Sequence, residues 1–203
     1  MKIFCVGRNY VDHAKELGND IPDEPVIFLK PKSAFLQPHM PFYYPEFTNE
    51  LHYEVELVLR VSKNGKYIQE KHAAKYYNGI TVGIDFTARD IQQRLKEKGL
   101  PWEISKAWDN SAAVGKFTDI KPGMNLNDIN FCLYNNKELV QQGNSGQMMF
   151  TFDQIVAYVS QFFSLNIGDL IFTGTPAGVG ECVVGDQLEA FIEDDSLLEV
   201  EVK

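Results

Sequence analysis

Cysteine is scarce in this chain of 203 residues, which has only Cys5, Cys132 and Cys182. These cysteines are odd in number and far apart, and no two of them have the C-x-x-C spacing. The pattern argues against a disulfide framework and against a structural zinc site. We therefore expect three reduced thiols in the core.

Long apolar runs and basic runs are also missing. No stretch approaches the roughly 20 residues of a membrane-spanning helix, and the apolar start, MKIFCVGRNY, is too short for a signal peptide. The net charge is -9, which makes nucleic acid and acidic membrane surfaces poor partners. We expect a soluble, cytoplasmic protein that binds neither, and that binds a small anion only where local charges reverse the field.

The chain is long enough for one sizeable core, and 44% of its residues are hydrophobic. We expect a single domain over residues 1–203, because no repeat or linker divides the sequence. Short apolar segments at 2–7, 25–31 and 79–85 predict strands. Because strands outnumber helices and the two do not alternate regularly, the fold class is α+β, mostly β.

Three helices are expected between the strands. One follows residue 10 and ends at Gly18, a plausible C-terminal cap. A second runs from the N-cap Thr87 to Gly99. The third begins at Thr151, which forms a capping box with Gln154.

Two glutamates stand in the segment 51–60, LHYEVELVLR, which otherwise reads as a buried strand. Alternation places Glu54 and Glu56 on one face, and Tyr53 and Leu57 on the other. The two glutamates are roughly 6.5 to 7 Å apart at the backbone. An exposed strand face is the common explanation for such a pair.

Other residues favour a site over an exposed face. Asp85, at the end of a predicted strand, would make three carboxylates of the kind that Mg²⁺ or Mn²⁺ prefers. His13 and Glu16, three residues apart on a helix, suit a base and its orienting carboxylate, or an exposed surface pair. Lys106 lies between two tryptophans and suits either a partly buried cation or a snorkelling lysine.

Six segments carry a resemblance to a known family. They are GRNYVDHAKE, PVIFLKPKSA, LHYEVEL, GIDFTARDIQ, GLPWEISKAWD and GDLIFTGTPAGVG, in this order. Together they resemble the fumarylacetoacetate hydrolase family, in particular its short acylpyruvate hydrolases and oxaloacetate decarboxylases. The resemblance implies a mixed β-roll of the family's C-terminal-domain type with short helices, and a homodimer.

The resemblance also assigns roles. Glu54, Glu56 and Asp85 match the ligands of Mg²⁺ or Mn²⁺, and His13 and Glu16 match the dyad that activates water. Lys106 matches a lysine that faces the substrate oxygens. The substrate, a small 2-oxo acid, would also be bound by Arg8, Arg89, Gln92 and Thr175.

Three functions are consistent with these residues. The first is metal-dependent hydrolysis of a C–C bond in 2,4-dioxo acids, of the acylpyruvate or fumarylpyruvate type, which releases pyruvate and a carboxylic acid. The second is decarboxylation or keto-enol tautomerisation of oxaloacetate at the same site. The third is a metal-binding module without chemistry, which would leave His13, Glu16 and Lys106 unexplained.

Overall fold

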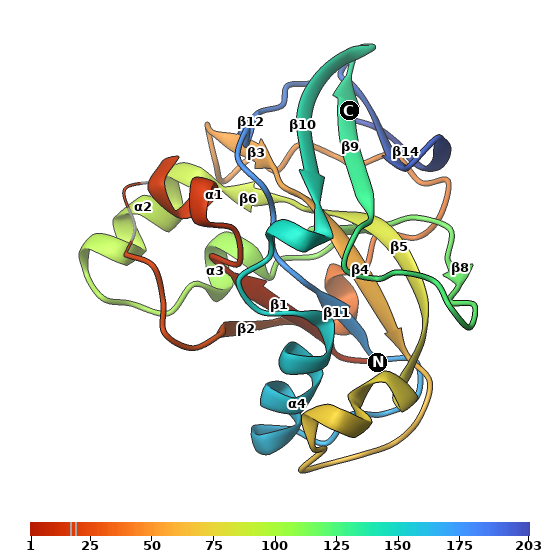
Figure 1. Cartoon of the computed structure of the whole chain (residues 1–203). Helices are drawn as coiled ribbons and strands as arrows, with labels where there is room; N and C mark the ends of the chain where they lie inside the picture. The colour runs from red at the N-terminus through yellow and green to blue at the C-terminus, as the bar shows by residue number, and fades with distance from the viewer. Residues whose placement is uncertain (17, 19) are drawn as a thin grey trace.

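The computed structural model describes residues 1–16, 18 and 20–203, and it is built mainly from strands (Figure 1). The largest sheet has the order β2-β1-β11-β4-β5-β7, and β8 pairs with β5. Its strands are β1 (Ile3–Gly7), β2 (Val26–Lys30), β4 (Val55–Val61), β5 (Tyr77–Asp85), β7 (Ala112–Val114), β8 (Thr118–Asp119) and β11 (Leu170–Phe172). β1 and β11 run parallel, and the other pairs are antiparallel. The predicted class, α+β and mostly β with a mixed sheet, is confirmed.

Two smaller sheets complete the β structure. One has the order β10-β9-β13-β14 and the other the order β12-β3-β6. Their strands are β3 (Leu51–Tyr53), β6 (Thr87–Ala88), β9 (Asn130–Asn135), β10 (Glu138–Asn144), β12 (Gly180–Glu181), β13 (Gln187–Ile192) and β14 (Asp195–Glu201).

The chain breaks its strands where it passes between two of these sheets. β3 and β6 pair with each other, as do β4 and β5. Glu54 lies between β3 and β4, and Asp85 ends β5 just before β6. The Asp85 amide donates to the Glu54 carbonyl at 2.9 Å. The two carboxyl-bearing residues are therefore adjacent at the bend.

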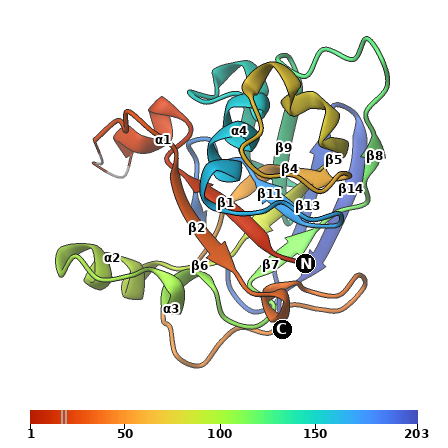
Figure 2. The same cartoon turned by 90° about the horizontal axis from the view of Figure 1, so that it is seen from below.

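Four α-helices lie around the sheets within the described residues: α1 (Val11–Glu16), α2 (Arg89–Glu97), α3 (Glu103–Lys106) and α4 (Phe152–Phe162). The 3₁₀ helices are η1 (Lys32–Ala34), η2 (Glu70–Lys75) and η3 (Ser145–Gln147). α2 and α3 lie side by side, with α1 on the same side of the molecule (Figures 1 and 2). None of the helices in the described part of the chain has the length and apolar character that a membrane span requires.

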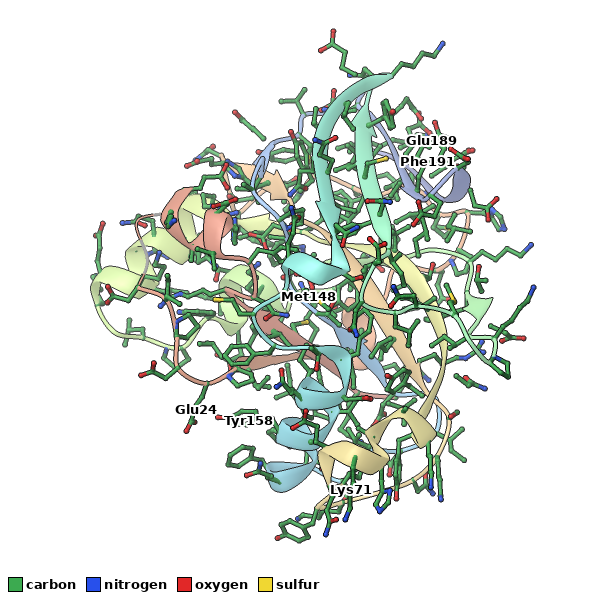
Figure 3. The ribbon with its side chains drawn as sticks, viewed as in Figure 1. Glu24, Lys71, Met148, Tyr158, Glu189 and Phe191 are labelled. Carbon is green, nitrogen blue, oxygen red and sulfur yellow. The ribbon has the colours of Figure 1, made fainter. Side chains whose placement is uncertain are left out.

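α4 confirms the clearest local signal of the sequence. Thr151 is its N-cap, and the Thr151 hydroxyl and the Gln154 side chain each accept from the other residue's backbone amide. On the outer surface of the helix, the Tyr158 hydroxyl donates to Glu24 at 2.9 Å (Figure 3). This bond ties α4 to the segment that leads into β2.

The other two predicted helix boundaries have mixed outcomes. Gly18 has φ +62° and its amide donates to the Lys15 carbonyl, as a helix terminator does; Leu17 lies outside the described residues. The N-cap predicted at Thr87 is wrong. Thr87 lies in β6, α2 begins at Arg89, and the Thr87 hydroxyl accepts from the Lys106 ammonium.

The main core forms on the face of β4 that the alternation of residues 51–60 predicts to be apolar, and a second buried cluster forms on the opposite face. Tyr53, Val55 and Leu57 belong to the main buried cluster, and Val58 belongs to a second cluster on the opposite face. Of the three thiols, Cys5 and Cys182 are buried and free, whereas Cys132 is free but only half-buried. The prediction of a core position is therefore wrong for Cys132.

Candidate active site

Glu54, Glu56 and Asp85 converge at the bend between the sheets. Each has a carboxylate oxygen within 4.8 Å of the other two. Their exposed fractions are 5%, 2% and 0%, so an exposed strand face is excluded. Burying three carboxylates together requires nearby positive charge, because a buried charge without a partner is strongly unfavourable.

Lys106 supplies part of that charge from the end of α3. Its ammonium donates to Glu54 at 2.7 Å, to Asp85 at 2.8 Å and to the Thr87 hydroxyl at 2.6 Å. Its side chain is 3% exposed, which excludes a snorkelling lysine. All three of its N–H donors are used, so a contact with substrate would require one of these partners to be released.

Lys30 supplies further positive charge, and the sequence analysis missed it. Its ammonium lies 2.7 Å from Asp85 Oδ1 and donates to the Ser111 carbonyl and hydroxyl and to the Lys106 carbonyl. Asp85 Oδ1 receives no hydrogen bond, so this pair is held by charge rather than by hydrogen-bond geometry. A lysine inside the apolar segment 25–31 was the available signal, because buried lysine needs a partner.

The electrostatics of the cluster fit a divalent cation. Burial, together with Asp85 and Glu54, raises the pKa of Glu56 well above its usual value. Burial also acts to raise the pKa of Glu54, but Lys106 and Arg89 outweigh it and lower that pKa. Lys30, Lys106 and Arg89 pair with Asp85 and Glu54, so Glu56 is the carboxylate left without a cationic partner among the described ion pairs. Carboxylate oxygens are the ligands that Mg²⁺ and Mn²⁺ prefer.

His13 and Glu16 form the expected pair on α1. His13 Nδ1 lies 3.2 Å from Glu16 Oε2, and Glu16 Oε1 accepts from the Gly178 amide at 3.0 Å. Burial lowers the pKa of His13 despite Glu54 and Glu16, so the ring is neutral at pH 7. With Nδ1 bound to Glu16, the other ring nitrogen is left as a proton acceptor.

Arg89 and Gln92 lie on the inner face of α2. The Arg89 guanidinium donates to Glu54 Oε1 at 2.5 Å, to the Gln92 side-chain oxygen and to His52 Nδ1. Both residues are buried. Arg89 is therefore held against a metal-ligand candidate, and Gln92 is held by Arg89.

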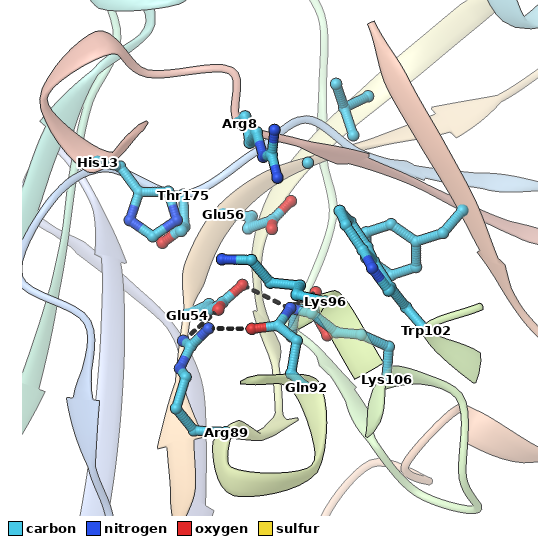
Figure 4. Close-up of a pocket in the computed structure, with 14 residues that line it drawn as sticks. Arg8, His13, Glu54, Glu56, Arg89, Gln92, Lys96, Trp102, Lys106 and Thr175 are labelled. Atoms are coloured by element: carbon cyan, nitrogen blue, oxygen red, sulfur yellow. Dashed lines mark hydrogen bonds and ion pairs between the residues drawn. The ribbon is translucent and has the colours of Figure 1, made fainter. Parts of the chain in front are cut away.

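These side chains line one pocket (Figure 4). His13 and Thr175 stand on one side and Trp102 on the other, with Glu54 and Glu56 between them. The remaining lining residues are Val6, Gly7, Arg8, Phe28, Asp85, Arg89, Gln92, Lys96 and Lys106. Of the predicted site residues, only Glu16 is not in the lining, and its carboxylate contacts His13 instead. Lys96 and Trp102 were missed.

Arg8 and Thr175 differ in how free they are to meet a ligand. Arg8 is half-buried and has φ +59°, a left-handed backbone that costs roughly 1–3 kcal/mol in a residue other than glycine. Its side chain reaches over Trp102, 5.9 Å from the ring centre. The Thr175 hydroxyl donates to the Val55 carbonyl at 2.8 Å, so its proton is already used. The substrate-binding role of Thr175 stays a prediction.

Comparisons with known proteins agree with the sequence motifs. The family model for the C-terminal region of fumarylacetoacetate hydrolase matches residues 2–203. The chain is 40% identical to a mitochondrial oxaloacetate tautomerase of Mus musculus, over 99% of this chain and 91% of that protein. It is 41% identical to a mitochondrial oxaloacetate decarboxylase of Dictyostelium discoideum, over 94% and 88%.

A solved structure is similarly close. Fumarylpyruvate hydrolase from Pseudomonas aeruginosa, crystallised with Mn²⁺ and pyruvate, superposes with a TM-score of 0.93 at 37% identity, covering 100% of this chain and 89% of that one. Because both curated relatives are named as mitochondrial, the expected cytoplasmic location is not confirmed.

Proposed function

The chain belongs to the fumarylacetoacetate hydrolase family, as its motifs indicated, and from that premise we propose that it is a metal-dependent enzyme acting on small 2-oxo acids. Its principal reaction is the keto-enol tautomerisation of oxaloacetate. The observation that carries the proposal is the pocket in which three buried carboxylates face a neutral, oriented histidine.

Glu54, Glu56 and Asp85 would hold Mg²⁺ or Mn²⁺. When bound, the dication would supply Lewis-acid polarisation of the 2-oxo group. The lysines behind the carboxylates hold them in place: Lys106 bridges Glu54 and Asp85, and Lys30 lies against Asp85. The ligand set is thus rigid before any substrate arrives, as electrostatic preorganisation requires.

His13 moves the proton. Its free ring nitrogen faces the pocket and accepts a proton from C3 of the 2-oxo acid, while Glu16 and the Gly178 amide keep the ring oriented. In the keto-to-enol direction the same nitrogen returns the proton to the oxygen, and in the enol-to-keto direction the proton moves from the oxygen to C3. Glu16 also stabilises the imidazolium that forms during this step.

The charge of the pocket supports a dianionic substrate such as oxaloacetate. Among the described residues that line it, Arg8, Arg89, Lys96 and Lys106 are cationic and three are carboxylates, an excess of one positive charge. A dication raises that excess to three. Two substrate carboxylates balance it better than the single carboxylate of an acylpyruvate does.

Hydrolysis of a 2,4-dioxo acid is the second candidate, because the His13 and Glu16 pair also suits activation of water. In that reaction His13 takes a proton from water, the hydroxide attacks the distal carbonyl, and the C–C bond breaks to give a carboxylic acid and the enolate of pyruvate. The likeness to fumarylpyruvate hydrolase supports this candidate.

The homodimer stays a prediction.

The test compares the two substrates on one preparation. Ultraviolet absorbance follows conversion of enol-oxaloacetate to its keto form, and acetate release follows cleavage of acetylpyruvate, each with Mg²⁺ or with chelator. We expect chelator-sensitive tautomerisation well above the buffer rate. Faster metal-dependent cleavage of acetylpyruvate would make hydrolysis the principal reaction. If both activities persist in chelator, the metal-dependent mechanism is refuted.

A further inference from the structure

Gln141 is a buried amide on a strand whose neighbouring residues are largely exposed. It lies in β10 with an exposed fraction of 2%, while Leu139 and Gln142 are exposed. The pairing of β10 with β9 shifts register between Leu139 and Gln141. Such a bulge re-aims a side chain, and here the Gln141 side chain points inward to the candidate active site.

Both polar atoms of the Gln141 amide have hydrogen-bond partners. Its oxygen accepts from the Val55 amide at 2.9 Å. Its nitrogen donates to the Thr175 hydroxyl at 2.9 Å and to the Pro176 carbonyl at 3.1 Å. Only one orientation of the amide satisfies all three partners, because a backbone N–H must meet the oxygen and a carbonyl must meet the nitrogen.

Gln141 and Thr175 together form the hydrogen bonds with the Val55 backbone that a neighbouring strand would otherwise form. On one edge of β4, Val55 pairs with Ile84 of β5. On the other edge, the pairing of β4 with β11 stops at Val58. Beyond that point Gln141 accepts from the Val55 N–H, and the Thr175 hydroxyl donates to the Val55 carbonyl.

Val55 is the residue between Glu54 and Glu56, so this clamp holds the backbone from which both carboxylates extend. Glu56 is fixed further by the Gly174 amide, which donates to it at 2.7 Å. The bulge beside Gln141 also packs against the residue that orients Glu16, since a Cβ on Gly178 would lie 2.7 Å from the Val140 carbonyl oxygen. One segment of β10 thus supports the candidate metal ligands and the base.

We propose that Gln141 is a positioning residue that sets the divalent-metal affinity of the site by clamping the Val55 peptide between Glu54 and Glu56. The proposal rests on the metal site of the proposed function. A residue that only forms hydrogen bonds with a buried backbone affects the stability of the protein. A positioning residue also affects the geometry of the metal ligands. Loss of such partners commonly weakens metal binding 10- to 100-fold.

The experiment measures the Mn²⁺ dissociation constant of the purified protein by calorimetry, without substrate, together with its metal-free melting temperature. Gln141→Met keeps the length of the side chain and removes its three hydrogen bonds. Gln142→Met, the exposed neighbour on the same strand, is the matched control. We expect Gln141→Met to weaken Mn²⁺ binding about tenfold or more, and Gln142→Met to leave it unchanged.

Thr175→Val provides a second route if Gln141→Met does not fold. It removes the hydroxyl that donates to the carbonyl of the same residue, Val55, so it should also weaken Mn²⁺ binding. If both variants fold, their effects should be less than additive, because they act on one backbone unit.

The outcomes separate the two proposals. Failure of the wild-type protein to bind Mn²⁺ would refute the metal site and this inference with it. If the wild-type protein binds Mn²⁺ and Gln141→Met binds it with the same affinity, the inference is overturned and the metal site stands. Thr175→Val gives the same test if Gln141→Met does not fold. A lower melting temperature with unchanged Mn²⁺ affinity would reduce Gln141 to a packing residue.

Discussion

Replacing Lys30 with methionine tests whether the acidic cluster depends on its buried lysines. The change removes an ammonium that lies 2.7 Å from Asp85 Oδ1 and donates to two carbonyls and a hydroxyl. Breaking a buried ion pair by removing one partner costs about 3–5 kcal/mol. For a chain of this length that corresponds to a melting temperature lower by roughly 6 to 20 °C.

Differential scanning calorimetry of the metal-free protein measures the effect, with Lys32→Met as control because Lys32 is exposed two residues away. A melting temperature within about 2 °C of wild type would refute the electrostatic reasoning.

Three further predictions concern the chemistry. His13→Ala should reduce tautomerisation of oxaloacetate and cleavage of acetylpyruvate by at least about 100-fold, while calorimetry shows unchanged Mn²⁺ binding; retained turnover would exclude His13 as the base. Lys96→Gln should lower kcat/KM about tenfold for oxaloacetate and little for acetylpyruvate, with the exposed Lys98→Gln as control; equal losses would contradict a preference for dianions. Burial lowers the pKa of His13 below 6.5. Activity should therefore stay constant from pH 7 down past pH 6.5 and fall only at the lower pH at which His13 takes up a proton. A loss of activity that begins above pH 6.5 would contradict a neutral base.

The segment 51–60 shows what the sequence could predict. Strict alternation places Glu54 and Glu56 apart from Tyr53 and Leu57, and the structure places Tyr53 and Leu57 in the main core and the carboxylates in the pocket. Periodicity is a local property of the chain, so it survives folding. The burial of the carboxylates could not be predicted from the local sequence, because it depends on cations from α2, α3 and β2.

The features that sequence reasoning missed share this dependence on distant partners. Gln141 contacts Val55, 86 residues away, and Lys30 contacts Asp85 across the sheet. Thr87 is a favourable N-cap residue by type, yet its hydroxyl instead serves the Lys106 ammonium. At such positions the tertiary contacts of the site override the local propensity of the sequence. Predictions from local sequence therefore fail there.

The buried lysines also explain how an acidic protein can keep three carboxylates together. Lys106 and Lys30 lie against Glu54 and Asp85, and Arg89 pairs with Glu54, so most of the negative charge is balanced within the protein. Glu56 has no lysine or arginine partner among the described ion pairs, only the Gly174 amide. Glu56 is thus the ligand candidate whose charge the protein leaves without a cation, so Glu56→Gln should weaken Mn²⁺ binding while stabilising the metal-free fold. Calorimetry on this one variant would show both effects, and a less stable metal-free protein would contradict the argument.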